Sequence, residues 1–350
     1  MTPRILAVRL GSLGDIVHAL PAVASLRAAF PAGRLDWLVE TRWREFVVRN
    51  PDVNQVVAVD TLSWRRRALA PVTWGEIRSA VRALRAAGYD LAVDFQGLFK
   101  SALLARLSGA PRRIGFERGS LKEPAAATFY TETVRPATGA HVIEMNLALA
   151  RAAGAAGDDR RFSLPTSPEE EGSLEAILRR QQIRGDYFVL SPGGGWGSKR
   201  WPPERYAQLH NELARRTGWR SFLNAGPGEE ELVSRIVAGC RVTRPVNSPL
   251  TLGQLIALLR RARVVVAGDT GPLHLAAALG TPVVGLYGPT DPARNGPVGP
   301  EGSGRAAVLH HAELATITYK REERPGPALL AITVEEVVRA VERVTEAAHG

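Results

Sequence analysis

The segment Val264-Val265-Val266-Ala267-Gly268-Asp269-Thr270-Gly271-Pro272-Leu273-His274 carries the clearest structural signal in the chain. Its apolar start predicts a buried strand, and Pro272 suits the first position of a helix. Backbone N–H groups at a helix start have no partner within the helix, and with the helix dipole they favour an anion. The segment therefore predicts a strand, a tight turn and a helix that together bind a diphosphate.

Two glycines distinguish this turn from an ordinary helix start. Gly268 and Gly271 let the backbone approach a ligand closely. Asp269 and Thr270 can cap the helix without any ligand, but capping alone does not require two glycines. His274 is left open between a contact with the ligand and a buried core residue. We expect the turn to have a function beyond capping.

Strand-like and helix-like segments alternate on both sides of this turn. A strand expected at 4–10 precedes a helix at 16–30, and a strand at 187–190 precedes a helix at 203–216. This alternation predicts parallel sheets with helices on both faces. Ligands of such sheets bind beyond the carboxyl ends of the strands. We therefore expect an α/β fold of two Rossmann-like domains whose sheets face each other across a cleft.

The length of 350 residues also favours two domains, because one compact core seldom grows so large. The polar composition of residues 154–172 fits a connection between them. The expected parts are a first Rossmann-like domain at 1–160, a second at 161–332, and a C-terminal helix at 333–350 that could pack back on the first domain.

Two more loops in the second half follow predicted strands. Residues 191–202 are rich in glycine and include Lys199, a compact cation suited to a phosphate oxygen, although the spacing is not that of a P-loop. Residues 224–231 include Glu229, which could accept hydrogen bonds from ribose hydroxyls. A solvated lysine and an acid that merely stabilises a helix start are the simpler readings. Two glycine-rich loops within one domain make an anion site the better interpretation.

The first strand of the chain is followed by a similar loop with an acid at its end. Gly11 and Gly14 resemble part of a dinucleotide fingerprint, and Glu40 ends the next strand, so a nicotinamide-dependent oxidoreductase is a rival hypothesis. Asp15 argues against it, because its charge at the helix start would repel a pyrophosphate. An acid in this place suits proton abstraction from a hydroxyl, although it can also cap the helix.

These segments together resemble the ADP-heptose:lipopolysaccharide heptosyltransferases, a family of GT-B glycosyltransferases. The resemblance covers nearly the whole chain, and its first two segments are more similar to the enzymes that add the first heptose than to those that add the second. The matching segments are Leu13 to Pro21 (LGDIVHALP), Asp94 to Ser101 (DFQGLFKS), Lys199 to Pro202 (KRWP), Asp269 to His274 (DTGPLH) and Tyr287 to Pro292 (YGPTDP).

The resemblance implies an inverting transfer of heptose from ADP-heptose to the Kdo region of lipid A. It also implies that the domain at 1–160 binds the acceptor and that the domain at 161–332 binds the nucleotide sugar. It implies that Asp15 is the general base, that Lys199 and the turn at 269–273 bind the diphosphate, and that Glu229 meets the ribose. The family often has threonines just before the lysine, whereas this chain has glycines, Trp196 and Ser198. The expected donor-binding residues are Ser198, Glu229, Asp269, Thr270, Gly271, Pro272, Leu273 and His274, with Asp15 and Lys199 as the catalytic pair.

Protein groups would stabilise the leaving phosphate in this scheme. The sequence contains no Asp-x-Asp pair, so we expect neither a metal nor another cofactor beside the donor substrate. Asp15 and Lys199 belong to different predicted domains and would meet only when the cleft closes, which would keep water from the donor sugar.

The net charge of +10 favours anionic partners. Candidates to face lipid A phosphates or Kdo carboxylates are Arg65, Arg66, Arg67, Lys100 and Lys122, although scattered solubilising charge is the simpler reading of each. No nucleic-acid motif accompanies the charge, and the oligomeric state is left open. A single cysteine, with no signal peptide and no spanning segment, predicts a cytoplasmic protein. The lipid A acceptor that the resemblance implies would make it peripheral on the cytoplasmic face of the inner membrane.

Overall fold

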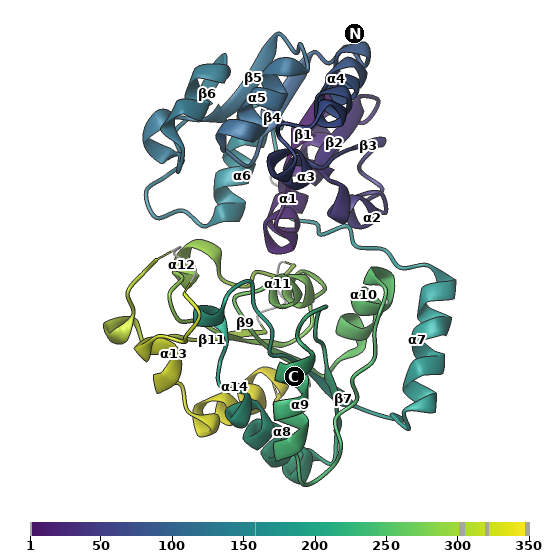
Figure 1. The fold of residues 1–350 in the computed structure, drawn as a ribbon, viewed down its shortest axis with the longest axis vertical. Coiled ribbons are helices and arrows are strands. Elements are labelled where there is room, and N and C mark those ends of the chain that lie inside the picture. Colours follow the sequence, from purple (N-terminus) through teal and green to yellow (C-terminus); the bar gives the residue numbers. More distant parts are fainter. Residues whose placement is uncertain (1, 158, 301–304, 319–321, 347–350) are drawn as a thin grey trace. The chain divides into compact units, whose positions relative to one another are not determined.

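The computed structural model describes residues 2–157, 159–300, 305–318 and 322–346. The chain divides into two compact units, Met1–Pro165 and Thr166–Gly350, and each has its own sheet with helices against it (Figure 1). Both sheets are entirely parallel, as the alternation of strands and helices predicts.

The first unit has a six-stranded sheet in the order β3-β2-β1-β4-β5-β6. Ile5 in β1 pairs with Leu35 on one side and with Leu91 on the other, so β1 is central and its apolar residues are buried. The elements are β1 (Arg4–Val8), α1 (Leu13–Ala29), β2 (Arg34–Glu40), η1 (Thr41–Trp43), α2 (Arg44–Val47), β3 (Gln55–Val59), α3 (Thr61–Arg66), α4 (Pro71–Ala86), β4 (Leu91–Asp94), α5 (Phe99–Leu107), β5 (Arg112–Phe116), η2 (Arg118–Ser120), η3 (Pro124–Phe129), β6 (Glu132–Val134) and α6 (Val142–Ala152).

The second unit has a five-stranded sheet in the order β11-β10-β9-β7-β8, so the loops after β7 and β9 leave neighbouring strands. The elements are α7 (Pro168–Arg180), β7 (Tyr187–Ser191), η4 (Gly197–Lys199), α8 (Pro203–Thr217), β8 (Arg220–Leu223), α9 (Glu230–Gly239), α10 (Leu252–Arg261), β9 (Val264–Gly268), α11 (Gly271–Ala278), β10 (Val283–Leu286), α12 (Pro292–Asn295), β11 (Ala306–Leu309), η5 (Ala312–Leu314), α13 (Pro327–Ala331) and α14 (Val334–Glu346).

The helix expected at 333–350 is α14. Val337 and Val341 on its apolar side lie in the core of the second unit, in one hydrophobic cluster with Trp201. The indole N–H of Trp201 donates to the carbonyl of Ile332 at 3.1 Å, just before this helix. The structure therefore counts α14 with the second unit. None of the described helices has the length and apolar character that crossing a membrane requires.

Helix α1 begins at Leu13, three residues before the start that the apolar spacing predicts. Ser12 is its N-cap residue, and Asp15 therefore lies within the first turn. In the second unit, Pro272 lies in the first turn of α11 as expected. Both helices follow the carboxyl end of a central strand, which is where ligands of parallel sheets bind.

Candidate functional site

The loop after β7 and the turn after β9 converge on one carboxylate, that of Asp269. Lys199 Nζ forms an ion pair with its Oδ2, and Nε2 of His274 lies 3.0 Å from its Oδ1. The Nδ2 of Asn295 donates to Oδ2 at 3.3 Å. Lys199 Nζ also lies 4.5 Å from the centre of the Trp196 ring, within the range of a cation–π contact. These side chains come from segments that follow β7, β9 and β10 at the carboxyl edge of the sheet, and the ion pair of Lys199 and Asp269 among them is largely buried.

Asp269 is held as a carboxylate. Burial raises its pKa, but the hydrogen bond with His274 and the charges of His274 and Lys199 outweigh burial and bring the pKa well below its usual range. His274 is buried and is a partner of Asp269, and its contact with the ligand stays a prediction. Within the described ranges, no group of three His, Cys, Asp or Glu side chains is arranged to hold a metal ion.

Gly268 brings the two loops into backbone contact. A Cβ atom on Gly268 would lie 2.8 Å from the carbonyl oxygen of Lys199, closer than real Cβ atoms come. The structure thus requires glycine at 268 for this contact between loops, and the approach to a ligand that the sequence suggested stays a prediction. A Cβ atom on Gly197 would lie 1.7 Å from the carbonyl oxygen of Glu323. The lysine loop is therefore packed against backbone on two sides.

Glu229 lies against the first residues of the lysine loop. The N–H of Gly226 donates to its Oε2 at 2.8 Å, and Nη2 of Arg200 lies 3.9 Å from its Oε1. A Cβ atom on Gly193 would lie 2.2 Å from Oε1, so glycine is needed there to admit the carboxylate. The structure thus brings Glu229 to the loop that carries Lys199.

The remaining expected donor residues lie at the start of α11 and in η4. Thr270 is the N-cap residue of α11, and its hydroxyl donates to the carbonyl of Gly268 at 3.2 Å. Gly271 and Pro272 form the first turn, and Leu273 is fully buried. Ser198 is buried as well, and its N–H donates to the carbonyl of Glu322 at 2.9 Å. Its Oγ has no hydrogen-bond partner among the described residues.

Asp15 lies at the carboxyl end of β1 in the first unit. Its Oδ2 accepts hydrogen bonds from the N–H and the hydroxyl of Ser12, at 2.8 and 3.0 Å. Its Oδ1 lies 2.6 Å from Nη2 of Arg9, whose Nη1 donates to the carbonyl of Phe95. The Arg9 side chain is 9% exposed and the Asp15 side chain 41% exposed. A carboxylate has about four acceptor positions, so Asp15 retains capacity for a substrate proton.

The loop after β4 supports the loop that ends at Asp15. Asp94 is fully buried, and its carboxylate accepts from the N–H of Gln96 at 2.9 Å and from the hydroxyls of Ser101 and Tyr130 at 2.8 Å each. Burial outweighs these bonds and raises the pKa of Asp94. The side chain of Gln96 in turn accepts from the N–H of Leu10 at 2.7 Å. Asp94 therefore has a positioning role within the fold.

Lys100 is paired within the protein. Its Nζ lies 3.4 Å from Oε1 of Glu40 and 3.0 Å from the hydroxyl of Thr61. Glu40 also accepts from the N–H of Thr61 at 3.2 Å, and its side chain is largely buried. Glu40 is thus engaged by two protein partners and is poorly placed to bind a ribose, which the oxidoreductase hypothesis required.

The other basic candidates are exposed. Arg65 and Arg66 end α3, and Arg67 follows them and pairs with Glu76 at 3.3 Å. Lys122 lies between η2 and η3. Lys100 contacts Thr61, the first residue of α3, so the structure connects it to the helix that carries the arginines.

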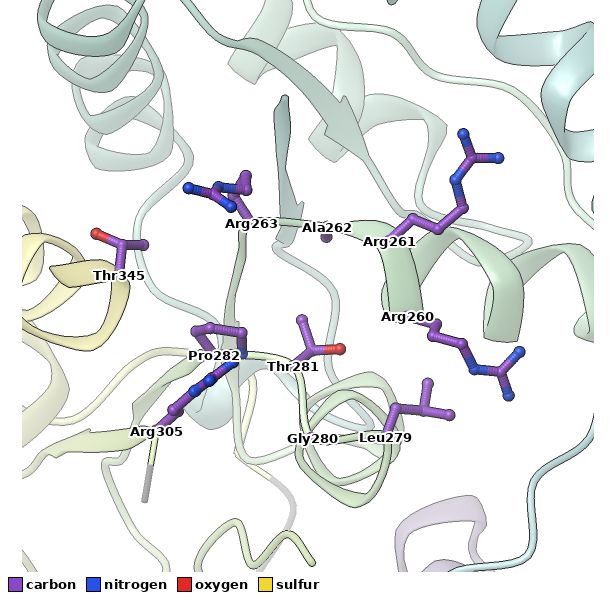
Figure 2. A pocket seen from close by; sticks show the side chains of 10 residues that line it. All are labelled: Arg260, Arg261, Ala262, Arg263, Leu279, Gly280, Thr281, Pro282, Arg305 and Thr345. Atoms are coloured by element: carbon purple, nitrogen blue, oxygen red, sulfur yellow. The ribbon is translucent and has the colours of Figure 1, made fainter. Parts of the chain in front are cut away.

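A hollow in the second unit lies at the opposite edge of its sheet, beside the amino ends of β9, β10 and β11 (Figure 2). Arg260 and Arg261 extend to one side of it, while Arg263 and Arg305 lie on the other side. Arg260 pairs with Glu171 at 3.3 Å and Arg261 with Glu175 at 2.7 Å. Both belong to the last turn of α10, where cations stabilise the helix dipole. These ion pairs and the helix dipole explain the positions of Arg260 and Arg261 without a ligand.

Comparison with known proteins identifies the family. The model of glycosyltransferase family 9 (heptosyltransferase) matches residues 77–323, well over half of the chain. The chain belongs to this family. The expected resemblance to heptosyltransferases is confirmed, and so is a GT-B architecture of two α/β units with parallel sheets. This heptosyltransferase is therefore a glycosyltransferase, and the rival oxidoreductase hypothesis is wrong.

Individual relatives agree with the family. The heptosyltransferase is 35% identical over 297 residues to lipopolysaccharide heptosyltransferase 1 of Pseudomonas aeruginosa, which covers 85% of this chain and 81% of the relative. It superposes on the structure of E. coli heptosyltransferase WaaC with ADP with a TM-score of 0.76, at 29% identity and with 97% of this chain and 99% of that chain covered. The structure of WaaC with ADP-2-deoxy-2-fluoro heptose gives a TM-score of 0.74, with the same identity and coverage.

The sequence of this heptosyltransferase did not reveal several partners of the expected residues. Arg9 had a signal, since it is a charged residue inside an otherwise apolar strand-like run. No sequence signal pointed to Asn295, at the end of α12, or to Glu323, because they meet Asp269 and Gly197 only through folding.

Proposed function

We propose that this heptosyltransferase transfers L-glycero-D-manno-heptose from ADP-heptose to the Kdo region of lipid A in the synthesis of the lipopolysaccharide inner core. The observation that carries the proposal is the buried ion pair of Lys199 and Asp269 at the start of α11. The printed names of the relatives support the transfer, and the WaaC structures with ADP and with a fluorinated ADP-heptose support the donor.

The diphosphate of the donor is assigned to the second unit. An ammonium group has three donor hydrogens, and the Asp269 carboxylate orients one of them in Lys199. The ammonium also lies 3.4 Å from the carbonyl oxygen of Asp269, and its remaining hydrogen is left to meet a phosphate oxygen together with the N–H of Gly271 at the start of α11. As the bond between the sugar and ADP breaks, negative charge grows on the phosphate, and these preorganised donors stabilise it. Glu229 accepts hydrogen bonds from the ribose of ADP.

Asp15 is assigned as the general base. A hydroxyl of the acceptor attacks the anomeric carbon of the heptose from the face opposite to ADP and loses its proton to the Asp15 carboxylate. The new carbon–oxygen bond forms as the bond to the diphosphate breaks, so the configuration inverts. Ser12 and Arg9 hold the carboxylate in place during this step. Positioned acid–base catalysis of this kind contributes about 10²- to 10⁴-fold to the rate.

The acceptor is assigned to basic residues of the first unit. Arg65, Arg66, Arg67, Lys100 and Lys122 would face the phosphates of lipid A or the carboxylates of Kdo. This acceptor places the protein at the cytoplasmic face of the inner membrane as a peripheral enzyme.

The test incubates the purified protein with ADP-heptose and Kdo-lipid A and determines the anomeric configuration of the product by NMR. We expect an inverted linkage, and we expect the same rate in the presence of EDTA because protein groups stabilise the leaving group. Parallel reactions with ADP-glucose and UDP-glucose define donor choice. A higher kcat/KM with another nucleotide sugar would assign this chain to a related transferase reaction instead.

A further inference from the structure

One segment of the first unit exposes apolar side chains that the proposed reaction does not use. Leu69, in the turn between α3 and α4, is 98% exposed, and Val72 and Trp74 at the start of α4 are 55% and 51% exposed. Single exposed apolar residues are common on protein surfaces, but contiguous ones usually mark an interaction site. Three exposed apolar side chains within residues 69–74 therefore indicate an interaction site.

The turn that carries Leu69 is ordered by hydrogen bonds on both sides. The N–H of Ala70 donates to the carbonyl of Arg67 at 2.9 Å, and the hydroxyl of Thr73 donates to the same carbonyl at 2.8 Å. Thr73 is itself buried, so it anchors the start of α4 to the unit. Leu69 is thus held outward by a defined turn.

The surroundings of these apolar residues are strongly basic. Between residues 61 and 87 the chain has six arginines and one carboxylate, Glu76, which is already paired. Trp74, Arg78 and Arg82 are exposed and follow one another at intervals of four residues along α4, so the aromatic ring and two cations share one side of the helix.

We propose that Leu69, Trp74, Arg78 and Arg82 form a docking surface for an anionic lipid bilayer, while Val72 lies on the other flank of α4. Leucine and tryptophan side chains enter the boundary between headgroups and acyl chains, where tryptophan is favoured. The arginines meet the negative charge of the headgroups. A nucleic acid would meet the same arginines but would gain nothing from a fully exposed leucine. The inference deepens the proposed function and rests on it in one respect, that the acyl chains of the acceptor are held in a membrane.

The test measures sedimentation of the full chain with vesicles that contain phosphatidylglycerol and with vesicles of phosphatidylcholine alone. We expect binding to the first kind only, weakened by salt. The variant Leu69→Gln/Trp74→Gln should lose at least about tenfold in affinity, because it removes the apolar part of the surface. The variant Arg78→Gln/Arg82→Gln should lose about 25-fold, since each arginine near an anionic surface contributes about fivefold.

Matched controls remove similar side chains elsewhere. Val48→Gln/Val242→Gln removes two exposed apolar residues, and Arg184→Gln/Arg241→Gln removes two exposed arginines. Both controls should bind vesicles as the wild type does. Unchanged vesicle binding by the Leu69/Trp74 variant would overturn the docking surface, since charge alone would then account for binding. Equal losses in the controls would also overturn it.

Transfer to a soluble acceptor without acyl chains separates this inference from the proposed function. The docking variants should keep wild-type kcat with that acceptor, because their side chains take no part in the reaction. Vesicle binding without any heptose transfer by the wild type would overturn the proposed function and leave the docking surface standing. Transfer without vesicle binding would overturn the docking surface alone.

Discussion

Nη2 of Arg9 lies 2.6 Å from Oδ1 of Asp15, and the other terminal nitrogen of the same guanidinium donates to the carbonyl of Phe95. A largely buried arginine therefore ties the proposed base to the loop after the neighbouring strand. Arginine suits this place because its planar group can hold two acceptors in a fixed geometry.

Replacement of Arg9 is expected to lower kcat with little change in the KM for the donor, because Arg9 positions the base and does not contact ADP. We expect a loss of at least about tenfold for Arg9→Gln and a partial recovery for Arg9→Lys, which restores the charge but only one direction of hydrogen bonding. Steady-state kinetics with both substrates measure the change in kcat separately from the change in the donor KM. A rise in donor KM at constant kcat would show that Arg9 acts on donor binding instead.

Substitution of Asp15 by asparagine is expected to remove the base while keeping the shape of the side chain. Transfer should fall by about 10²- to 10⁴-fold. Calorimetric titration with ADP-heptose should give a Kd close to that of the wild type, since the donor site belongs to the second unit. Asp60→Asn, which changes another helix-capping aspartate of the first unit, is the control and should retain activity. Full activity of Asp15→Asn would eliminate the assignment of the base.

Two glycines of the lysine loop offer a matched pair for the donor site. Gly193→Ala would place a methyl group 2.2 Å from the Glu229 carboxylate, whereas the same change at Gly195 meets nothing within 4 Å. We expect Gly193→Ala to displace Glu229 and raise the donor KM by roughly tenfold, a loss of about 1.4 kcal/mol. Gly195→Ala should be close to neutral. Equal kinetics for the two variants would remove Glu229 from the ribose site.

The Asp269 cluster predicts a pH dependence of stability. The pKa of Asp269 in the folded protein lies below its unfolded value of about 3.9, so its carboxylate stabilises the fold above that pH. This contribution should decline as the pH falls below about 4 towards the lower folded pKa. Asp269→Asn leaves Lys199 and His274 without their partner and should cost about 3 kcal/mol at pH 7.

Denaturant unfolding of the wild type and Asp269→Asn between pH 7 and pH 3 checks this dependence. The difference in the free energy of unfolding should be constant down to about pH 5 and should shrink below about pH 4. Asp186→Asn is the control, because its partner Arg263 lies 3.3 Å away in an exposed pair worth less than about 1 kcal/mol. A difference that stays constant through pH 3 contradicts the assigned ionisation.

Sequence patterns located the loops of the site but not the contacts within them. Strand β9 and helix α11 were predictable from local sequence, because a run of valines favours a strand and Pro272 favours the first turn of a helix. Strand β6 was not, since it has three residues at the edge of a sheet and none is fully buried. The partners of Asp269 and Glu229 come from segments distant in sequence and depend on packing. The sequence showed Arg9 as a charged residue within an apolar strand, but it did not predict the ion pair of Arg9 with Asp15.

The absence of a side chain at position 268 has a consequence for how such enzymes diverge. Because the backbone of Lys199 occupies the space next to Gly268, a side chain at position 268 would require the lysine loop to move. Natural variation at these two places should be correlated, and a grafted lysine loop should function only when the turn after β9 is transplanted with it. Altering donor choice by engineering would then mean exchanging both loops as a single module.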